Sequence, residues 1–194
     1  MIPELVLIAI VVGWIFGGRL TRLADAPIKW TWLIAVCIGI YAVAFGVTQV
    51  PSIATKAGWF YRSTFVLERI LFLVFVYANR RILGSQLVFL GMILNLVAIL
   101  ANGGVMPASP SAVGVAFGQE HLKREMARPH VQSSIKYGYK LAPLCDILPT
   151  RRPFLFVRGV YSVGDLFITA GMFLAIVVLM RRPLPREKLT TQNA

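Results

Sequence analysis

The chain has few charged residues, and acidic residues are the scarcest. Only 14% of its 194 residues are charged, with 8 Asp or Glu against 20 Lys or Arg. A soluble domain usually has about a quarter of its residues charged. Together with a hydrophobic content of 57%, this scarcity argues against a soluble domain and favours a membrane protein.

Signatures of common catalytic and metal sites are also missing. The two cysteines, Cys37 in an apolar stretch and Cys145 in a polar one, form no CxxC pair and predict no disulfide framework. His121 and His130 stand in neither an HxxxH nor an HExxH pattern, so no metal ligand is predicted. Walker, GxGxxG and GxSxG motifs are absent. No catalytic residue can be named, which favours a non-enzyme and leaves enzymatic activity open.

What the sequence does contain is long apolar blocks separated by short basic segments. The blocks cover about residues 2–18, 30–47, 59–78, 84–101 and 163–180. Each is close to the length that a helix needs to cross the hydrocarbon core. The first block is followed by positive charge, the reverse of a cleavable signal peptide. We therefore predict an all-α integral membrane bundle of five transmembrane helices, with residues 1–194 as a single domain.

The connections are short except for one. Residues 102–161 form a long loop between the fourth and fifth blocks, and residues 181–194 form a short tail. Within the loop, residues 118–128 predict a short polar helix that Pro129 ends. Residues 151–158 place apolar bulk between arginines, a pattern typical of a segment at the lipid headgroups.

Basic residues predict the orientation in the membrane. With five crossings, the first connection, the third connection and the tail lie on one side. Their basic residues are Arg19, Arg22, Lys29, Arg80, Arg81, Arg181, Arg182, Arg186 and Lys188. The positive-inside rule makes this side cytoplasmic and the N-terminus external, in an inner (plasma) membrane. The charge is expected to meet anionic lipid headgroups; no nucleic-acid site is predicted, because no basic stripe alternates with aromatics.

Two charges inside the third block are the most informative residues. Glu68 and Arg69 lie near its middle, where ionisable side chains are costly and usually face a partner or a cavity. Counted by depth, Asn95 and Asp165 fall at the same level in the outer half of the bundle. We expect Arg69 to pair with Asp165, or Glu68 to bond Asn95. The cluster would either fix helix register or bind a lipid headgroup, a quinone or a proton.

Other features have a structural interpretation. Ser162 and Asp165 fit a capping box at the start of the fifth helix. Small residues form stripes on the helices, which permit close backbone approach inside the chain or to another subunit. These stripes contain Gly13 and Gly17, then Gly84, Gly91, Asn95, Ala98 and Asn102, and finally Gly164 and Gly171.

Four short elements carry a resemblance to a known family. They are Gly17-Gly18-Arg19-Leu20, Asn95 with Asn102-Gly103-Gly104-Val105-Met106-Pro107, Leu144-Cys145-Asp146-Ile147 and Ser162-Val163-Gly164-Asp165. In this order they resemble an uncharacterised bacterial family of multi-pass membrane proteins, the domain of unknown function 5317. Cys145 departs from the glycine expected before the loop aspartate. The resemblance implies a bacterial plasma membrane and no activity, and it adds Asn102 and Asp146 to the candidate ligand-binding residues.

Two functions remain open. The first, which the lack of a catalytic constellation and the small-residue stripes favour, is an accessory subunit or assembly factor of a larger membrane complex. The second is a small carrier or lipid-acting enzyme that binds an anionic or lipophilic ligand, with bound lipid or quinone as the cofactor-like molecule. Its candidate site consists of Glu68, Arg69, Asn95, Asn102, Asp146 and Asp165.

Overall fold

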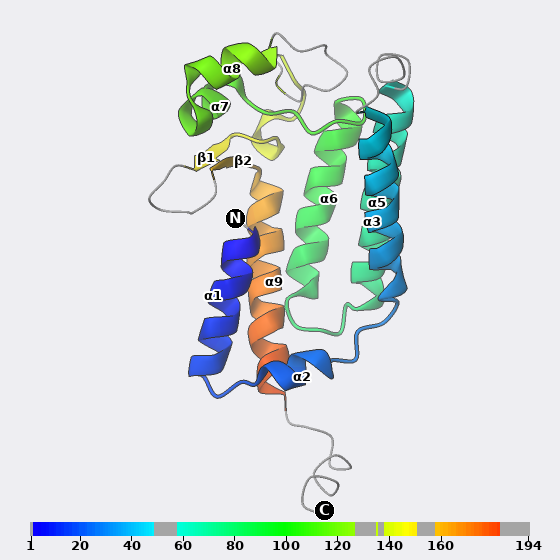
Figure 1. The fold of residues 1–194 in the computed structure, drawn as a ribbon, viewed down its shortest axis with the longest axis vertical. Coiled ribbons are helices and arrows are strands. Elements are labelled where there is room, and N and C mark those ends of the chain that lie inside the picture. Colours follow the sequence, from blue (N-terminus) through cyan, green and yellow to red (C-terminus); the bar gives the residue numbers. More distant parts are fainter. Residues whose placement is uncertain (1, 49–57, 127–134, 136–137, 151–157, 183–194) are drawn as a thin grey trace, which may run out of the picture.

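The computed structural model describes residues 2–48, 58–126, 135, 138–150 and 158–182. The chain is mostly helical, as predicted (Figure 1). The long helices are α1 (Ile2–Ile15), α3 (Trp32–Thr48), α5 (Gly58–Ala78), α6 (Ser85–Ala101) and α9 (Val163–Arg181). The last four begin and end within two residues of the predicted blocks.

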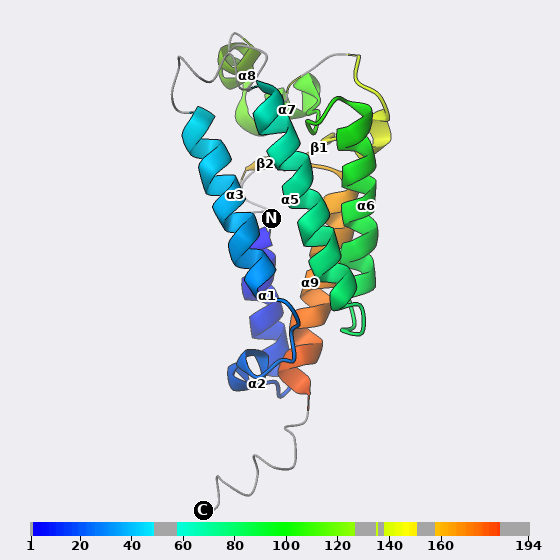
Figure 2. The same cartoon turned by 90° about the vertical axis from the view of Figure 1, so that its right-hand side faces the viewer.

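The long helices run alternately up and down and pack as a curved row. Contacts join α1 to α9, α9 to α6, α6 to α5, and α5 to α3. Figure 1 shows α1 and α3 at the two ends of this row, and Figure 2 shows them both on one side with α6 on the other. The N-terminus of α1, the start of α9 and the long connection therefore lie towards one end, which we call the cap end. The C-terminus of α9 lies at the opposite end, the tail end.

Glycines bring α6 and α9 into backbone contact. A Cβ added to Gly171 would lie 2.5 Å from the carbonyl oxygen of Gly84, and one added to Gly164 would lie 2.6 Å from that of Gly91. Both distances are shorter than real Cβ contacts, so only glycine fits. The stripes predicted on these two helices thus pack against each other. On each helix the two contacting glycines are seven residues apart.

The first predicted helix ends three residues early. α1 stops at Ile15, because Gly17 takes a positive φ of 77° and the Gly18 amide bonds the Gly13 carbonyl at 2.8 Å. The chain then forms α2 (Leu20–Ala24), a short helix that the sequence did not indicate and that lies across the tail end (Figure 1). The Arg19 amide donates to the Met180 carbonyl at 3.0 Å, which ties this corner to the end of α9.

A buried asparagine closes the tail end on the other side. The Asn79 side chain accepts from the Lys29 amide at 2.8 Å and donates to the Lys29 carbonyl at 3.0 Å. The two bonds join the first connection to the end of α5, as two backbone hydrogen bonds between neighbouring strands would. No sequence pattern singled out Asn79.

The long connection folds into a small cap of its own (Figure 1). The cap comprises α7 (Pro110–Phe117), α8 (Gln119–Met126), the 3₁₀ turn η1 (Ala142–Leu144) and the antiparallel strands β1 (Leu148–Thr150) and β2 (Gly159–Tyr161). Ala108, Val113 and Leu122 form its core. The prediction of a single helix over 118–128 was therefore incomplete. The predicted headgroup segment and most of the tail lie outside the described residues.

Large apolar side chains face outward along the helices. Leu7 on α1 is 64% exposed, and Ile38 and Val43 on α3 are 64% and 61% exposed. One helix of the described ranges, α9, is both long and apolar enough to cross a membrane. Helices α3 and α6 are apolar but have 17 residues each, while α5 has 21 residues and includes Arg62, Glu68 and Arg69.

Candidate functional site

Glu68 and Arg69 pair with each other on α5. An Arg69 guanidinium nitrogen (Nη1) lies 3.6 Å from Glu68 Oε1, and the guanidinium sits 4.6 Å from the centre of the Phe65 ring. The Glu68 side chain is 16% exposed and that of Arg69 is 38% exposed. Glu68 faces the α3 side, where it lines a narrow gap with Tyr41. The positive charge of Arg69 is thus balanced by its own helix.

A closed hydrogen-bond network joins α6 to the start of α9. Asn95 Nδ2 donates to Asp165 Oδ1 at 2.9 Å, and Ser162 Oγ donates to Asn95 Oδ1 at 2.8 Å. The Ser162 amide donates to Asp165 Oδ2 at 3.0 Å, and the Asp165 amide donates to Ser162 Oγ at 3.0 Å. The last two bonds are the predicted capping box, which is confirmed.

The predicted pairings between these groups are wrong. Asp165 bonds Asn95 and its own helix start, and no ion pair links it to Arg69 among the described residues. Glu68 does not reach Asn95, because it points towards α3. Equal depth was the only basis for these pairings, and depth does not fix the direction in which a side chain leaves its helix.

Asn102 holds the cap onto the end of α6. Its Nδ2 donates to the carbonyls of Ala98, at 2.8 Å, and Lys140, at 2.9 Å, and its Oδ1 accepts from the Lys140 amide at 2.8 Å. Cys145, fully buried, lies beside it at 3.9 Å. Asn102 does not line the cavity described below. Its place is structural: it positions the segment that carries Asp146.

Asp146 is fixed through its backbone, and its side chain is turned to the interior. Its amide donates to the Pro107 carbonyl at 3.0 Å, and its carbonyl accepts from the Ser109 amide at 2.9 Å. Burial, together with the nearby Asp165 carboxylate, raises the pKa of the Asp146 carboxyl to about 7. A carboxyl buried without a compensating charge holds its proton more tightly. Near neutral pH, Asp146 is therefore poised between its two protonation states.

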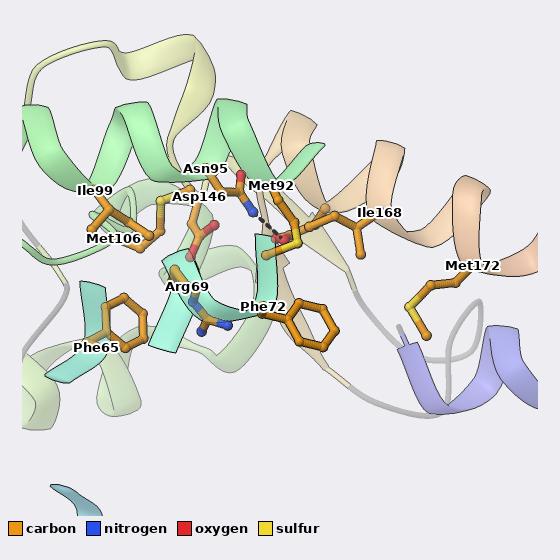
Figure 3. Close-up of a pocket in the computed structure, with 11 residues that line it drawn as sticks. Phe65, Arg69, Phe72, Met92, Asn95, Ile99, Met106, Asp146, Ile168 and Met172 are labelled. Carbon is orange, nitrogen blue, oxygen red and sulfur yellow. Dashed lines mark hydrogen bonds between the residues drawn. The ribbon is translucent and has the colours of Figure 1, made fainter. Parts of the chain in front are cut away.

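Asp146 and Asp165 meet Arg69 and Asn95 around one cavity of 510 Å³, formed by α5, α6, α9 and the cap (Figure 3). Its remaining walls are apolar. They are lined by Phe65, Phe72, Met92, Ile99, Met106, Ile168 and Met172. Figure 3 shows the polar groups midway along the cavity, with apolar side chains on both sides.

Of the six residues predicted to bind a ligand, four line this cavity: Arg69, Asn95, Asp146 and Asp165. Its volume falls within the range of about 300–1,000 Å³ that is usual for small-molecule sites, and apolar walls with a few convergent polar groups are the usual composition. Within the part of the chain that the structure describes, no three His, Cys, Asp or Glu residues gather as metal ligands. The arrangement suits a lipophilic organic molecule with one polar centre.

Sequence reasoning missed the apolar wall of the cavity. Phe65, Phe72 and Met92 looked like ordinary residues of apolar helices, since nothing in a uniformly apolar block marks which face is inward. Phe65 and Phe72 are four residues before and three residues after Arg69, so helical spacing alone could have placed them on its face. Glu4, buried on α1 at 7% exposure, was also overlooked as a polar position within the first block.

Comparison with known proteins identifies the family. The model of the family of unknown function DUF5317 matches residues 25–177. The match covers most of the chain, so the chain belongs to this family, as the sequence elements indicated. No curated protein and no solved structure shows significant similarity.

Proposed function

We propose that the chain is a multi-pass membrane protein that binds a lipophilic small molecule in the cavity between α5, α6, α9 and the cap. The observation that carries this proposal is the cavity itself: 510 Å³, with apolar walls and four polar side chains directed into it. A bundle that merely anchored itself in lipid would have no need to keep ionisable groups around an internal space.

The outward-facing apolar side chains support five membrane crossings. Soluble proteins rarely expose large contiguous apolar surfaces, whereas Leu7, Trp14, Ile38 and Val43 are all more than 60% exposed. At about 1.5 Å per residue, α5 with 21 residues and α9 with 19 measure about 31 and 28 Å. The hydrocarbon core is about 30 Å thick. α3 and α6, with 17 residues each, are at the short end of the usual range.

The basic residues support an orientation with the tail end in the cytoplasm. Arg19, Arg22, Arg80, Arg81 and Arg181 all lie at this end of the described structure, next to the ends of apolar helices. The positive-inside rule then makes the cap and the N-terminus external. The resemblance to a bacterial family adds the plasma membrane of a bacterium. A reporter fused to the C-terminus, fluorescent only in the cytoplasm, tests this orientation.

Native mass spectrometry tests the binding proposal. The tagged protein would be extracted from its own membrane in mild detergent, and its mass compared with that of the bare chain. We expect an added mass that corresponds to one bound small molecule. This added mass should be lost in Ile168→Trp, whose larger side chain fills the cavity. The exposed Leu166→Trp, on the same helix, serves as the matched control. A bare chain in every preparation would contradict the proposal.

An accessory subunit of a larger complex is the second candidate, and α3 favours it. Gly39 and Gly46 are exposed on α3, seven residues apart, and no atom lies within 4 Å of a Cβ added at either. This spacing would let a helix of another chain approach closely. The stripes on α6 and α9 no longer support a partner, because they are used within the chain. In the same mass spectrum, stoichiometric additional chains would establish this role.

A further inference from the structure

The charges around the cavity bear on the chemical class of its ligand. Arg69 is paired with Glu68, so these two contribute no net charge. Asp165 and Asp146 both face the cavity, and no described Lys or Arg lies within ion-pair distance of either carboxylate. The polar centre of the cavity is thus acceptor-rich and negative, which disfavours the anionic ligand among the two classes, anionic or lipophilic, expected from the sequence.

The position of the polar groups narrows the shape of the ligand. They lie midway along the cavity, between the side of Phe65, Ile99 and Met106 and the side of Phe72 and Met172 (Figure 3). A lipid molecule carries its charged headgroup at one end. With the headgroup at the polar groups, its tail would cover the apolar wall on one side only, and the apolar wall on the other side would face the polar headgroup. A molecule whose charged centre is surrounded by apolar groups matches both sides.

Resting on the proposed function, we propose that the cavity binds a hydrophobic organic cation, with its positive centre against the carboxylates of Asp146 and Asp165 and its apolar groups against the Phe and Met side chains. The phenylalanines add to the selectivity, because aromatic faces attract cations. Asp165 is held by Asn95 and by the capping box and has no freedom to move. Asp146 makes no side-chain hydrogen bond within the described residues, so its carboxyl is free to meet the ligand.

Binding of the cation is coupled to release of a proton. A cation stabilises the ionised carboxylate of Asp146, so its proton leaves to the solvent as the cation enters. The groups that line the cavity with Asp146 are Arg69 of α5, Asn95 of α6 and Asp165 of α9, and the Cys145 thiol lies beside it on its own segment. Burial raises the pKa of Asp146 to about 7. About a tenth of the molecules are therefore ionised one pH unit below that value, and about nine tenths one unit above.

Equilibrium dialysis with tetraphenylphosphonium tests the inference, with tetraphenylborate as an anion of nearly the same shape. For the full chain in neutral detergent, we expect the cation to bind about tenfold more tightly at pH 8 than at pH 6, and the anion not to compete. Asp146→Asn should lower the affinity at pH 8 by more than tenfold and abolish the pH dependence, and Asp146→Glu should retain both. Glu120→Gln, whose carboxylate lies in the cap beside Lys123 at 3.4 Å, is the matched control.

The outcomes separate this inference from the proposed function. Equal or tighter binding of tetraphenylborate would overturn the preference for a cation while leaving the cavity a ligand site. A copurified lipid with a terminal headgroup, retained in Asp146→Asn, would have the same effect. If neither ion binds and the chain is bare in its own membrane extract, both proposals fall.

Discussion

Replacing Gly171 with alanine tests whether the backbone contact between α6 and α9 holds the bundle together. The added Cβ would lie 2.5 Å from the Gly84 carbonyl oxygen and 2.7 Å from the Val88 amide nitrogen. Both are backbone atoms, one in the N-cap of α6 and one in α6 itself, so neither can turn aside as a flexible side chain would. The two helices must separate locally to admit the methyl group.

The size of the effect follows from these distances. Ordinary contacts begin at 3.4 Å, so the helices must move apart by 0.9 Å (3.4 minus 2.5) at this point. Overpacking a well-packed interface costs about 1–3 kcal/mol. Alanine returns up to about 1 kcal/mol over glycine through its helix propensity. We expect Gly171→Ala to lower the free energy of unfolding by about 1–2 kcal/mol.

The same substitution at Gly39 is the control. No atom lies within 4 Å of a Cβ added there, and Gly39 lies within the exposed side of α3. Gly39→Ala should therefore be neutral or slightly stabilising. Thermal unfolding would be followed by circular dichroism in the same detergent. The unfolding temperature should fall for Gly171→Ala and stay unchanged or rise slightly for Gly39→Ala. If the two variants unfold at the same temperature as each other, the glycine contact between α6 and α9 is refuted.

Three further perturbations probe the network around the cavity. Ser162→Ala removes the N-cap of α9 and a bond to Asn95, and should lower the unfolding free energy by about 1–2 kcal/mol in the same assay; Ser63→Ala on an exposed position of α5 should not. Asn102→Ala frees the segment around Lys140 and should speed proteolysis of the cap without loss of helical signal; an unchanged digestion rate would contradict the clamp. Burial raises the pKa of Asp146 to about 7, so the folded chain binds more protons than the unfolded chain between about pH 4 and 7 and loses stability as the pH rises through that window. The loss is at most about 4 kcal/mol, and Asp146→Asn should flatten the profile of unfolding temperature against pH; an equally steep profile in the variant would refute the burial of this carboxyl.

The long helices could be predicted because their signals are local. Apolar blocks of helical length indicate where α3, α5, α6 and α9 lie. The end of α6 is indicated by the three residues Asn102-Gly103-Gly104. Gly103 and Gly104 take positive φ values of 74° and 87°, and the Gly104 amide bonds the Ile99 carbonyl at 2.9 Å. Glycine adopts this conformation without strain, so an Asn-Gly-Gly sequence after an apolar run is a reliable helix stop.

The cap could not be predicted, because its elements are held by distant contacts. Strands β1 and β2 have three residues each, too few for an alternating pattern to show. Helix α7 is a short apolar run, which periodicity cannot distinguish from a strand. What fixes this region is a set of bonds across the sequence, such as Asn102 to Lys140, 38 positions apart. The same holds for Asn79, which bonds Lys29 50 positions away.

Arg69, Asn95 and Asp165 could be found from charge and depth in the apolar blocks, but their interaction partners could not. Glu68 and Arg69 are adjacent, and their long side chains curl towards each other, which no helical-wheel argument anticipates. Asn95 and Asp165 were placed at one level and do bond each other. Asp146 came only from the family resemblance, because a lone aspartate in a polar loop carries no signal of burial.

Asp165 shows why the cavity must be tested through another residue. Its carboxylate completes the capping box of α9, bonds Asn95 and also lines the cavity. Removing it would unmake a helix start as well as a binding group, so a loss of ligand in Asp165→Asn could not be assigned to either. Asp146 shares the cavity, but its side chain serves no hydrogen bond of the described fold, and its position depends on backbone bonds that Asn preserves. A change in ligand affinity in Asp146→Asn, with unfolding temperature retained or raised above pH 7, would therefore report on the site alone.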